Sequence, residues 1–228
     1  MSSGAAERIA AIIPAAGSGS RFGANEPKAF FDLAGLSLLS RSALALSTFA
    51  EVIVVAAPSD WLSQAAEQLS NVDAEIHIVN GGETRQDSVH EALKVLPDDI
   101  ELVLVHDAAR PLVTQTVIAD VIATLKSGAA AVVPALPVAD TVKRVDASGT
   151  VVETLDRSTL RRIQTPQGFT RKVLENAFAD PTHIATDEAG LVERMGVTVQ
   201  TVMGSESAFK LTTAEDVQYA LSILQETT

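Results

Sequence analysis

Two cations follow a glycine-containing loop near the start of the chain. The segment 14–28 reads PAAGSGSRFGANEPK and comes directly after the apolar run Ile9–Ile13. The glycines of its Gly-Ser-Gly unit let a backbone approach a ligand closely. Arg21 and Lys28 supply positive charge where phosphate oxygens gather. These residue types in this order predict a site for a nucleoside triphosphate.

Other phosphate-binding loops have a different spacing. In the dinucleotide fingerprint G-x-G-x-x-G the third glycine would fall at Phe22, whereas the next glycine is Gly23. A Walker loop would require Gly-Lys-Ser/Thr, which does not follow. A plain glycine turn from a strand into a helix is the structural alternative. The nearby Arg and Pro-Lys pair favour the triphosphate site.

An acidic residue follows another apolar run. Asp107 comes just after Leu102–Val105, where a carboxylate can hold Mg²⁺ against phosphate oxygens. Capping of the next turn is an equally ordinary role for an Asp at this place. We expect Arg110 to be its ion-pair partner. We expect His106 to be packed or hydrogen-bonded near the site and not to be a metal ligand.

A glycine pair opens a further candidate loop in the segment 81–88, GGETRQDS. The backbone of such a turn can contact a base edge, and Ser88 can add a hydroxyl contact or cap a helix. We expect that helix to begin near Asp87. Other polar positions are typical of solvated surface when each is taken singly: Asp156, Arg157, Thr186, Asp187, Glu188 and Lys210.

Apolar runs alternate with amphipathic segments along the chain. The runs are rich in β-branched residues without strict alternation, which predicts strands covered on both faces: Ile9–Ile13, Val52–Ala56, Ile76–Val79, Leu102–Val105 and Ala130–Pro134. The segments between them predict crossover helices: Leu38–Thr48, Trp61–Leu69, Asp87–Val95 and Thr116–Lys126. The order predicts an α/β fold with a parallel sheet, with the three loops meeting at the carboxyl ends of the strands.

The segment 138–160 interrupts this order. Two short β-type stretches flank Asp-Ala-Ser-Gly at 146–149, which predicts a β-hairpin. A two-stranded hairpin is marginally stable alone. We therefore expect the hairpin to pack on another surface, which is either its own domain or, if the hairpin is an arm, a second subunit.

Composition limits the classes of function. With 228 residues, 46% of them hydrophobic, the chain has the size of one globular domain, 1–228. It has no cysteine, which excludes disulfides, thiol catalysis and thiolate metal sites. A net charge of −12 disfavours extended contact with nucleic acid or an anionic membrane. Neither a signal peptide nor a membrane-spanning run is evident, so we expect a cytoplasmic protein.

The ordered set of motifs resembles the 2-C-methyl-D-erythritol 4-phosphate cytidylyltransferases over essentially the whole chain. The first motif is shared with many sugar-nucleotide transferases, and the full set is much more specific. The resembling stretches are PAAGSGSRFGANEPK at 14–28, GGETRQDSV at 81–89, VHDAARP at 105–111, ADTVKRV at 139–145, DR at 156–157, TPQGF at 165–169, TDEAGLVE at 186–193 and FKLTTAEDV at 209–217.

The resemblance implies a Rossmann-like, GT-A-like nucleotidyltransferase with three layers, a mostly parallel central sheet and a protruding hairpin. It implies a homodimer with crossed arms that uses CTP and Mg²⁺ or another divalent cation, with the substrate phosphate attacking CTP directly. Arg21 and Lys28 would be catalytic, and Asp107 would hold the metal. The implied CTP contacts are Ala15, Ala16, Gly17, Gly82, Glu83 and Ser88. The implied substrate contacts are Thr186 and Lys210, with Thr141 and Arg157 from the second subunit.

Two departures from the family pattern accompany the match. Ala29 stands where Gln commonly follows Pro-Lys, and Glu83 occupies a position that is often Asp. Two other functions remain open on the sequence: a cytidylyltransferase for another polyol phosphate such as ribitol 5-phosphate, and a non-catalytic nucleotide-binding module. Retention of Arg21, Lys28 and Asp107 argues against the module, because nucleotide binding alone does not require all three.

Overall fold

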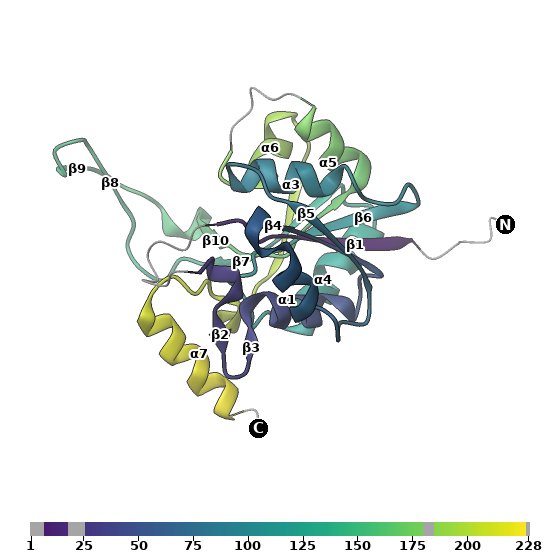
Figure 1. The fold of residues 1–228 in the computed structure, drawn as a ribbon. Coiled ribbons are helices and arrows are strands. Elements are labelled where there is room, and N and C mark those ends of the chain that lie inside the picture. Colours follow the sequence, from purple (N-terminus) through teal and green to yellow (C-terminus); the bar gives the residue numbers. More distant parts are fainter. Residues whose placement is uncertain (1–6, 18–25, 180–184, 227–228) are drawn as a thin grey trace.

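A twisted, mostly parallel sheet forms the centre of the molecule (Figure 1). The computed structural model describes residues 7–17, 26–179 and 185–226. All five predicted strands are confirmed, and their ends differ from the predicted ones by at most three residues. Within the described residues this sheet has eight strands: β1 (Arg8–Pro14), β4 (Val52–Ala57), β5 (Glu75–Asn80), β6 (Ile100–Val105), β7 (Ala131–Pro137), β10 (Arg161–Ile163), β11 (Gln167–Thr170) and β12 (Val199–Met203).

The sheet combines a parallel half with antiparallel additions. Strand β1 pairs in parallel with both β4 and β6, and β4 pairs in parallel with β5. Strand β11 runs antiparallel to both β6 and β7, β10 is antiparallel to β7, and β12 is parallel to β7. The loops after β1, β5 and β6 therefore leave the sheet at the same edge, as the sequence predicts.

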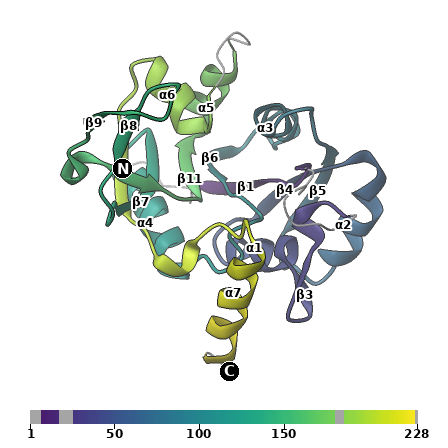
Figure 2. The same ribbon diagram turned by 90° about the vertical axis from the view of Figure 1, so that its left-hand side faces the viewer.

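Helices cover both faces of the sheet (Figures 1 and 2). One face carries α3 (Arg85–Leu93), α5 (Arg171–Phe178) and α6 (Glu188–Arg194), and the other carries α1 (Leu38–Ser47), α2 (Leu62–Gln68) and α4 (Gln115–Lys126). All four predicted crossover helices are present. The helix after β5 begins at Arg85, two residues before the predicted start, because Thr84 caps it and pairs with Asp87 in a capping box.

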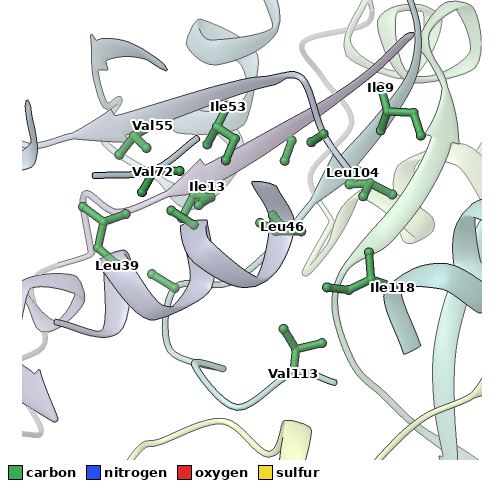
Figure 3. Packing of buried hydrophobic residues seen from close by; sticks show 14 of the residues in the cluster. Ile9, Ile13, Leu39, Leu46, Ile53, Val55, Val72, Leu104, Val113 and Ile118 are labelled. Atoms are coloured by element: carbon green, nitrogen blue, oxygen red, sulfur yellow. The ribbon is translucent and has the colours of Figure 1, made fainter. Parts of the chain in front are cut away.

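The core is divided by the sheet into two packed layers. Along β1, Ile9, Ala11 and Ile13 face one layer, while Ala10 and Ile12 face the other. Figure 3 shows the first layer, where Ile13 and Ile53 meet Leu39 and Leu46 of α1. Because a strand with two buried faces needs apolar residues at consecutive positions, the sequence shows continuous runs here and not alternation.

The predicted hairpin is present and projects from the body (Figure 1). It consists of β8 (Lys143–Val145) and β9 (Val151–Thr154), which pair antiparallel. Every residue of the two strands is exposed. The hairpin strands do not pack on the described part of their own chain. Packing of the hairpin on a second subunit stays a prediction.

The C-terminal helix α7 (Ala214–Glu226) packs on a small separate cluster that includes Leu33, Leu38 and Leu211. This cluster also holds the short β2–β3 hairpin (Asp32–Leu33 and Leu36–Ser37). No described helix combines the length and the apolar character that a bilayer-spanning segment requires.

Candidate active site

The three predicted loops enclose one cavity of about 400 Å³ at the carboxyl edge of the strands. The start of the glycine loop lines it after β1, Gly82 and the first turn of α3 line it after β5, and Asp107 lines it after β6. Lys28 and Lys210 complete its wall. The cavity contains nearly all the residues that the sequence assigns to a nucleotide site: Ala15, Ala16, Gly17, Lys28, Gly82, Glu83, Ser88 and Asp107.

The glycine loop leaves β1 in an extended conformation. The Ala15 amide donates to the Ala56 carbonyl at 2.8 Å, which continues the parallel pairing past the end of β1. Among the described residues, nothing lies within 4 Å of a side chain added at Gly17, so this part of the chain leaves the backbone there open to a ligand. Residues 18–25, with Arg21, lie outside the described residues.

Lys28 stands at the start of a short 3-10 helix, η2 (Lys28–Phe30), and lines the cavity. The next residue, Ala29, is 5% exposed and packs in the core. The position where the family commonly has Gln therefore contributes an apolar contact behind Lys28 and no polar neighbour.

The glycine pair after β5 is required by close packing. A Cβ at Gly81 would lie 2.4 Å from the Cβ of Ala16, and a Cβ at Gly82 would lie 2.2 Å from that of Asp87. The Ser88 hydroxyl accepts from the Gly82 amide at 3.1 Å and donates to the Thr84 carbonyl at 2.9 Å. Ser88 therefore holds the turn in shape. It is not the helix cap, which is Thr84.

Asp107 makes short contacts with two cations, and the predicted partner, Arg110, makes a longer ion pair with it. Its Oδ1 accepts from Arg85 Nε at 2.8 Å, and its Oδ2 accepts from Lys210 Nζ at 2.9 Å. Arg110 Nε lies farther away, at 3.9 Å from Oδ2. Burial by itself would raise the pKa of the Asp107 carboxyl, but Arg85 and Lys210 hold it well below its usual range. Asp107 is an ionised carboxylate with both oxygens engaged.

Besides its long ion pair with Asp107, Arg110 makes its hydrogen bonds to backbone carbonyls, a role that was not predicted. It donates to the carbonyl of Ala208 at 2.8 Å and to that of Ile163 at 3.4 Å. The Leu211 amide also donates to the Ala109 carbonyl at 2.9 Å. Arg110 thereby ties the loop after β6 to the segment that carries Lys210.

Arg85 and Glu188 are site residues that the sequence analysis missed. Arg85 Nη1 donates to both carboxylate oxygens of Glu188, at 2.8 and 2.9 Å. The Glu188 side chain is 1% exposed, which contradicts its interpretation as solvated surface. Burial raises the pKa of Glu188, and the Arg85 charge opposes that effect. The available signal was local: Asp187 is a good N-cap, and Glu188 follows it at the start of an apolar helix.

His106 is completely buried behind the site, as the sequence predicts. Its Nδ1 lies 3.0 Å from Thr165 Oγ1, and its Nε2 lies 3.3 Å from the Arg110 carbonyl. Thr165 Oγ1 also accepts from the Asp107 amide at 3.0 Å. Burial lowers the pKa of His106 to about 4. A neutral ring protonated on Nε2 satisfies the chain of hydrogen bonds that fixes the Asp107 backbone.

The residues predicted to contact the second substrate are divided. Lys210 lines the main cavity, and Thr186 lines an adjoining hollow together with Arg85 and Glu188. Thr141 and Arg157 lie in the projecting hairpin segment, where both are exposed. The Arg157 guanidinium donates to the Ala139 carbonyl. Among the described residues, neither of these two lines the cavity of its own chain.

A divalent cation fits this site only together with a phosphate ligand. Within residues 7–17, 26–179 and 185–226, no group of three or more His, Cys, Asp or Glu side chains could enclose a metal. Asp107 offers one carboxylate. Mg²⁺ is commonly bound by one or two carboxylates, with substrate phosphates and water as the other ligands. The donor set therefore suits Mg²⁺ that is also bound to a nucleotide.

Comparison with known proteins agrees with this geometry. The family model described as 2-C-methyl-D-erythritol 4-phosphate cytidylyltransferase matches residues 9–226. Proteins of that name from Saccharopolyspora erythraea and Rhodococcus opacus are 49% and 46% identical to this chain. The alignments cover 95% and 96% of this chain, and 99% and 96% of those proteins.

Solved structures give the same result. The 4-diphosphocytidyl-2C-methyl-D-erythritol synthase of Anaerococcus prevotii superposes with a TM-score of 0.82 at 32% identity. The 2-C-methyl-D-erythritol 4-phosphate cytidylyltransferase of Thermus thermophilus does so with a TM-score of 0.80 at 33% identity. Each alignment covers 96% of this chain and 99% of the solved one. This chain belongs to the 2-C-methyl-D-erythritol 4-phosphate cytidylyltransferase family.

Proposed function

We propose that this chain performs the reaction of its family. It transfers the cytidylyl group of CTP to 2-C-methyl-D-erythritol 4-phosphate and gives 4-diphosphocytidyl-2-C-methyl-D-erythritol and pyrophosphate, a step of non-mevalonate isoprenoid biosynthesis. The observation that carries the proposal is the single cavity in which two glycine loops, two lysines and one metal-type carboxylate converge. A triphosphate needs that combination of close backbone and positive charge.

The nucleotide side of the site is mostly backbone. Ala15, Ala16 and Gly17 surround CTP from the first loop. Gly82, Glu83 and Ser88 do so from the second, where the Ser88 hydroxyl keeps the glycine turn in shape. A contact made through the Glu83 backbone does not depend on whether the residue is Glu or Asp.

Catalysis requires no protein nucleophile. A phosphate oxygen of the methylerythritol phosphate attacks the α-phosphorus of CTP, and the bond to the β-phosphate oxygen breaks as pyrophosphate leaves. Arg21 and Lys28 stabilise the negative charge that grows on the triphosphate. Asp107 would hold a divalent cation, which would neutralise phosphate charge. The chain contributes chiefly alignment and charge neutralisation.

The second substrate is bound between two subunits. Thr186 and Lys210 come from the chain that binds CTP, and Thr141 and Arg157 come from the partner subunit of a homodimer. The projecting hairpin supports this arrangement, because Val145, Val151 and Val152 are each more than half exposed on it. A two-stranded hairpin without a packing surface is marginally stable, so crossed arms give it the surface it lacks.

Pyrophosphate release by the purified protein tests the proposal. The assay contains CTP, Mg²⁺ and either methylerythritol phosphate or ribitol 5-phosphate, with ATP, GTP and UTP replacing CTP as controls. Release with CTP and methylerythritol phosphate is the expected result. Preference for ribitol 5-phosphate would reassign the substrate, and no release with either would leave a nucleotide-binding module.

A further inference from the structure

One arginine links two carboxylates beneath the cavity. Arg85 uses Nε for Asp107, at 2.8 Å, and Nη1 for both oxygens of Glu188, at 2.8 and 2.9 Å. The other Asp107 oxygen is occupied by Lys210 at 2.9 Å. In this structure both oxygens of the proposed metal ligand are therefore occupied by cations of the protein. A divalent cation that binds Asp107 must either share the carboxylate with these two cations or take the place of one of them.

The two carboxylates differ in the ion-pair partners and the exposure that they would have without Arg85. Glu188 is 1% exposed, and its only ion-pair partner in the described part of the chain is Arg85. Asp107 keeps Lys210, and it faces the cavity. An unpaired buried charge costs far more than one that can reach solvent or a ligand. Arg85 is consequently anchored on Glu188, and its contact with Asp107 is the one that can be exchanged.

The Glu188 carboxylate is held in a fixed place by the backbone around it. The Gln167 side chain donates to Asp187 at 2.8 Å and accepts from the Ala189 amide at 3.1 Å. Asp187 caps α6 through the Gly190 amide at 3.0 Å. The helix start on both sides of Glu188 is thus bound to β11, at the centre of the sheet. A carboxylate fixed in this way can define where a guanidinium lies.

We propose that Glu188 is a positioning residue that acts through Arg85 to keep Asp107 available to a divalent cation. By sharing the guanidinium charge, Glu188 weakens the hold of Arg85 on Asp107. When the cation binds, Glu188 retains Arg85 and prevents it from competing for the carboxylate. This inference rests on the proposed metal role of Asp107. It deepens that role, because it makes metal affinity depend on a residue that touches neither metal nor substrate.

The test measures Mn²⁺ binding to the protein and does not rely on turnover alone. Relaxation enhancement of water protons distinguishes Mn²⁺ bound to the protein from Mn²⁺ bound to CTP. Glu188→Gln keeps the size of the side chain and removes its charge. We expect it to weaken Mn²⁺ binding in the presence of CTP about 10-fold or more, as loss of an outer partner of a metal ligand generally does. The Mg²⁺ concentration for half-maximal activity rises in parallel, and kcat recovers at saturating Mg²⁺.

Two further variants separate positioning from folding. Glu188→Asp retains the charge and restores most of the Mn²⁺ affinity, whereas Glu188→Gln does not. Glu175→Gln is the matched control, since it removes the charge of an exposed glutamate that pairs with Arg171 at 2.7 Å in α5, outside the cavity. It leaves Mn²⁺ binding unchanged. If Glu188→Gln does not fold, the comparison of Glu188→Asp with the wild type carries the test, with a smaller loss of affinity expected.

The outcomes distinguish the inference from the proposed function. Unchanged Mn²⁺ affinity in a folded Glu188→Gln protein overturns the inference, and so does a lower kcat that Mg²⁺ does not restore. If Asp107→Asn binds Mn²⁺ with CTP as tightly as the wild type, the metal role of Asp107 itself is wrong, and the inference is overturned with it. Wild-type activity with CTP would still stand in that case.

Discussion

The floor of the cavity, formed by Arg85, Asp107 and Glu188, and the β8–β9 hairpin both contain ion pairs, but those of the floor are buried and that of the hairpin is exposed. On the floor, Arg85, Asp107 and Glu188 are joined at 2.8 to 2.9 Å and largely removed from water. On the hairpin, Arg144 and Glu153 make a pair of the same length, 2.9 Å, with side chains 63% and 53% exposed.

The difference concerns what each region requires from its surroundings. A buried ion network is strongly destabilised when one member is lost, since the others remain charged and desolvated. An exposed pair contributes little, about 0 to 1 kcal/mol. The floor is complete within one chain, whereas the hairpin presents half-exposed valines with no packing partner in the described chain. One chain supplies the whole ion network of the floor, whereas the proposed crossed arms would give the hairpin a packing surface on a partner subunit.

The largest effect is expected on the floor side, from Lys28→Ala. The lysine should act on the charge that develops at the reacting phosphates, so its loss lowers kcat by about 10²- to 10³-fold. The dimer content, measured by analytical ultracentrifugation, stays unchanged. Wild-type turnover in this variant would remove Lys28 from the mechanism.

Arg157→Ala tests whether the two regions combine in one site. We expect low turnover from this variant alone, because the proposed site takes Arg157 from the partner subunit. Mixed with Lys28→Ala subunits it should regain up to about one quarter of wild-type activity per chain, since half the dimers are mixed and each has one intact site. Separately tagged subunits show by co-purification that mixed dimers form. No recovery despite such dimers would contradict the crossed arm.

The pH dependence of the unfolding free energy tests whether the region behind the floor is buried within one chain, because it contains the titratable side chain of His106. The pKa of His106 is lowered by burial from 6.5 to about 4. Between those values the unfolded chain binds a proton that the folded chain excludes. The stabilising contribution is therefore full above pH 6.5 and is lost as pH falls to about 4. We expect a loss of about 2 to 3 kcal/mol from this group.

Urea unfolding at several pH values measures this effect. His106→Gln removes the titrating ring and should flatten the dependence of the unfolding free energy on pH between 6.5 and 4. His77→Gln is the control, because that histidine is partly exposed on β5, away from the cavity. Parallel curves for the wild type and His106→Gln would show that the His106 ring is protonated in the folded protein.

The smallest effect on chain stability is expected in the hairpin. Val152→Ser changes an exposed side chain, so the unfolding free energy of the monomer should change by less than about 0.5 kcal/mol. Dimer dissociation should increase, because the valine gains its packing only from the partner subunit. A large loss of unfolding free energy in the monomer, or an unchanged dissociation constant of the dimer, would contradict the view that the hairpin packs on a partner subunit and not on its own chain.

The sequence predicted the fold well because the relevant signals are local. A continuous apolar run such as Val52–Ala57 is enough to indicate a strand buried on both faces. The loops after β1, β5 and β6 then meet because parallel strands place their carboxyl ends at one edge. The exposed hairpin was also visible from its turn. The start of α3 was misplaced because its cap, Thr84, competes with several nearby polar residues for that role.

The sequence did not predict which charged side chains form ion pairs with one another. Proximity in the chain favoured Arg110 for Asp107, but Arg85 and Lys210, which bind it, are 22 and 103 residues away. Glu188 looked like solvated surface because burial of a charge depends on a partner brought by another helix.

By itself the sequence indicated five of the eight strands described in the central sheet, the four crossover helices, the glycine turns and a resemblance to one family. The strands, helices and turns follow from residue types at short spacings, whereas the family followed from the resemblance of motifs spread along the whole chain. Only the tertiary structure decided which charges meet beneath the cavity, which carboxylate is hidden from water and which valines have no neighbour. Those properties depend on desolvation and on distances between elements, and no short-range pattern encodes either.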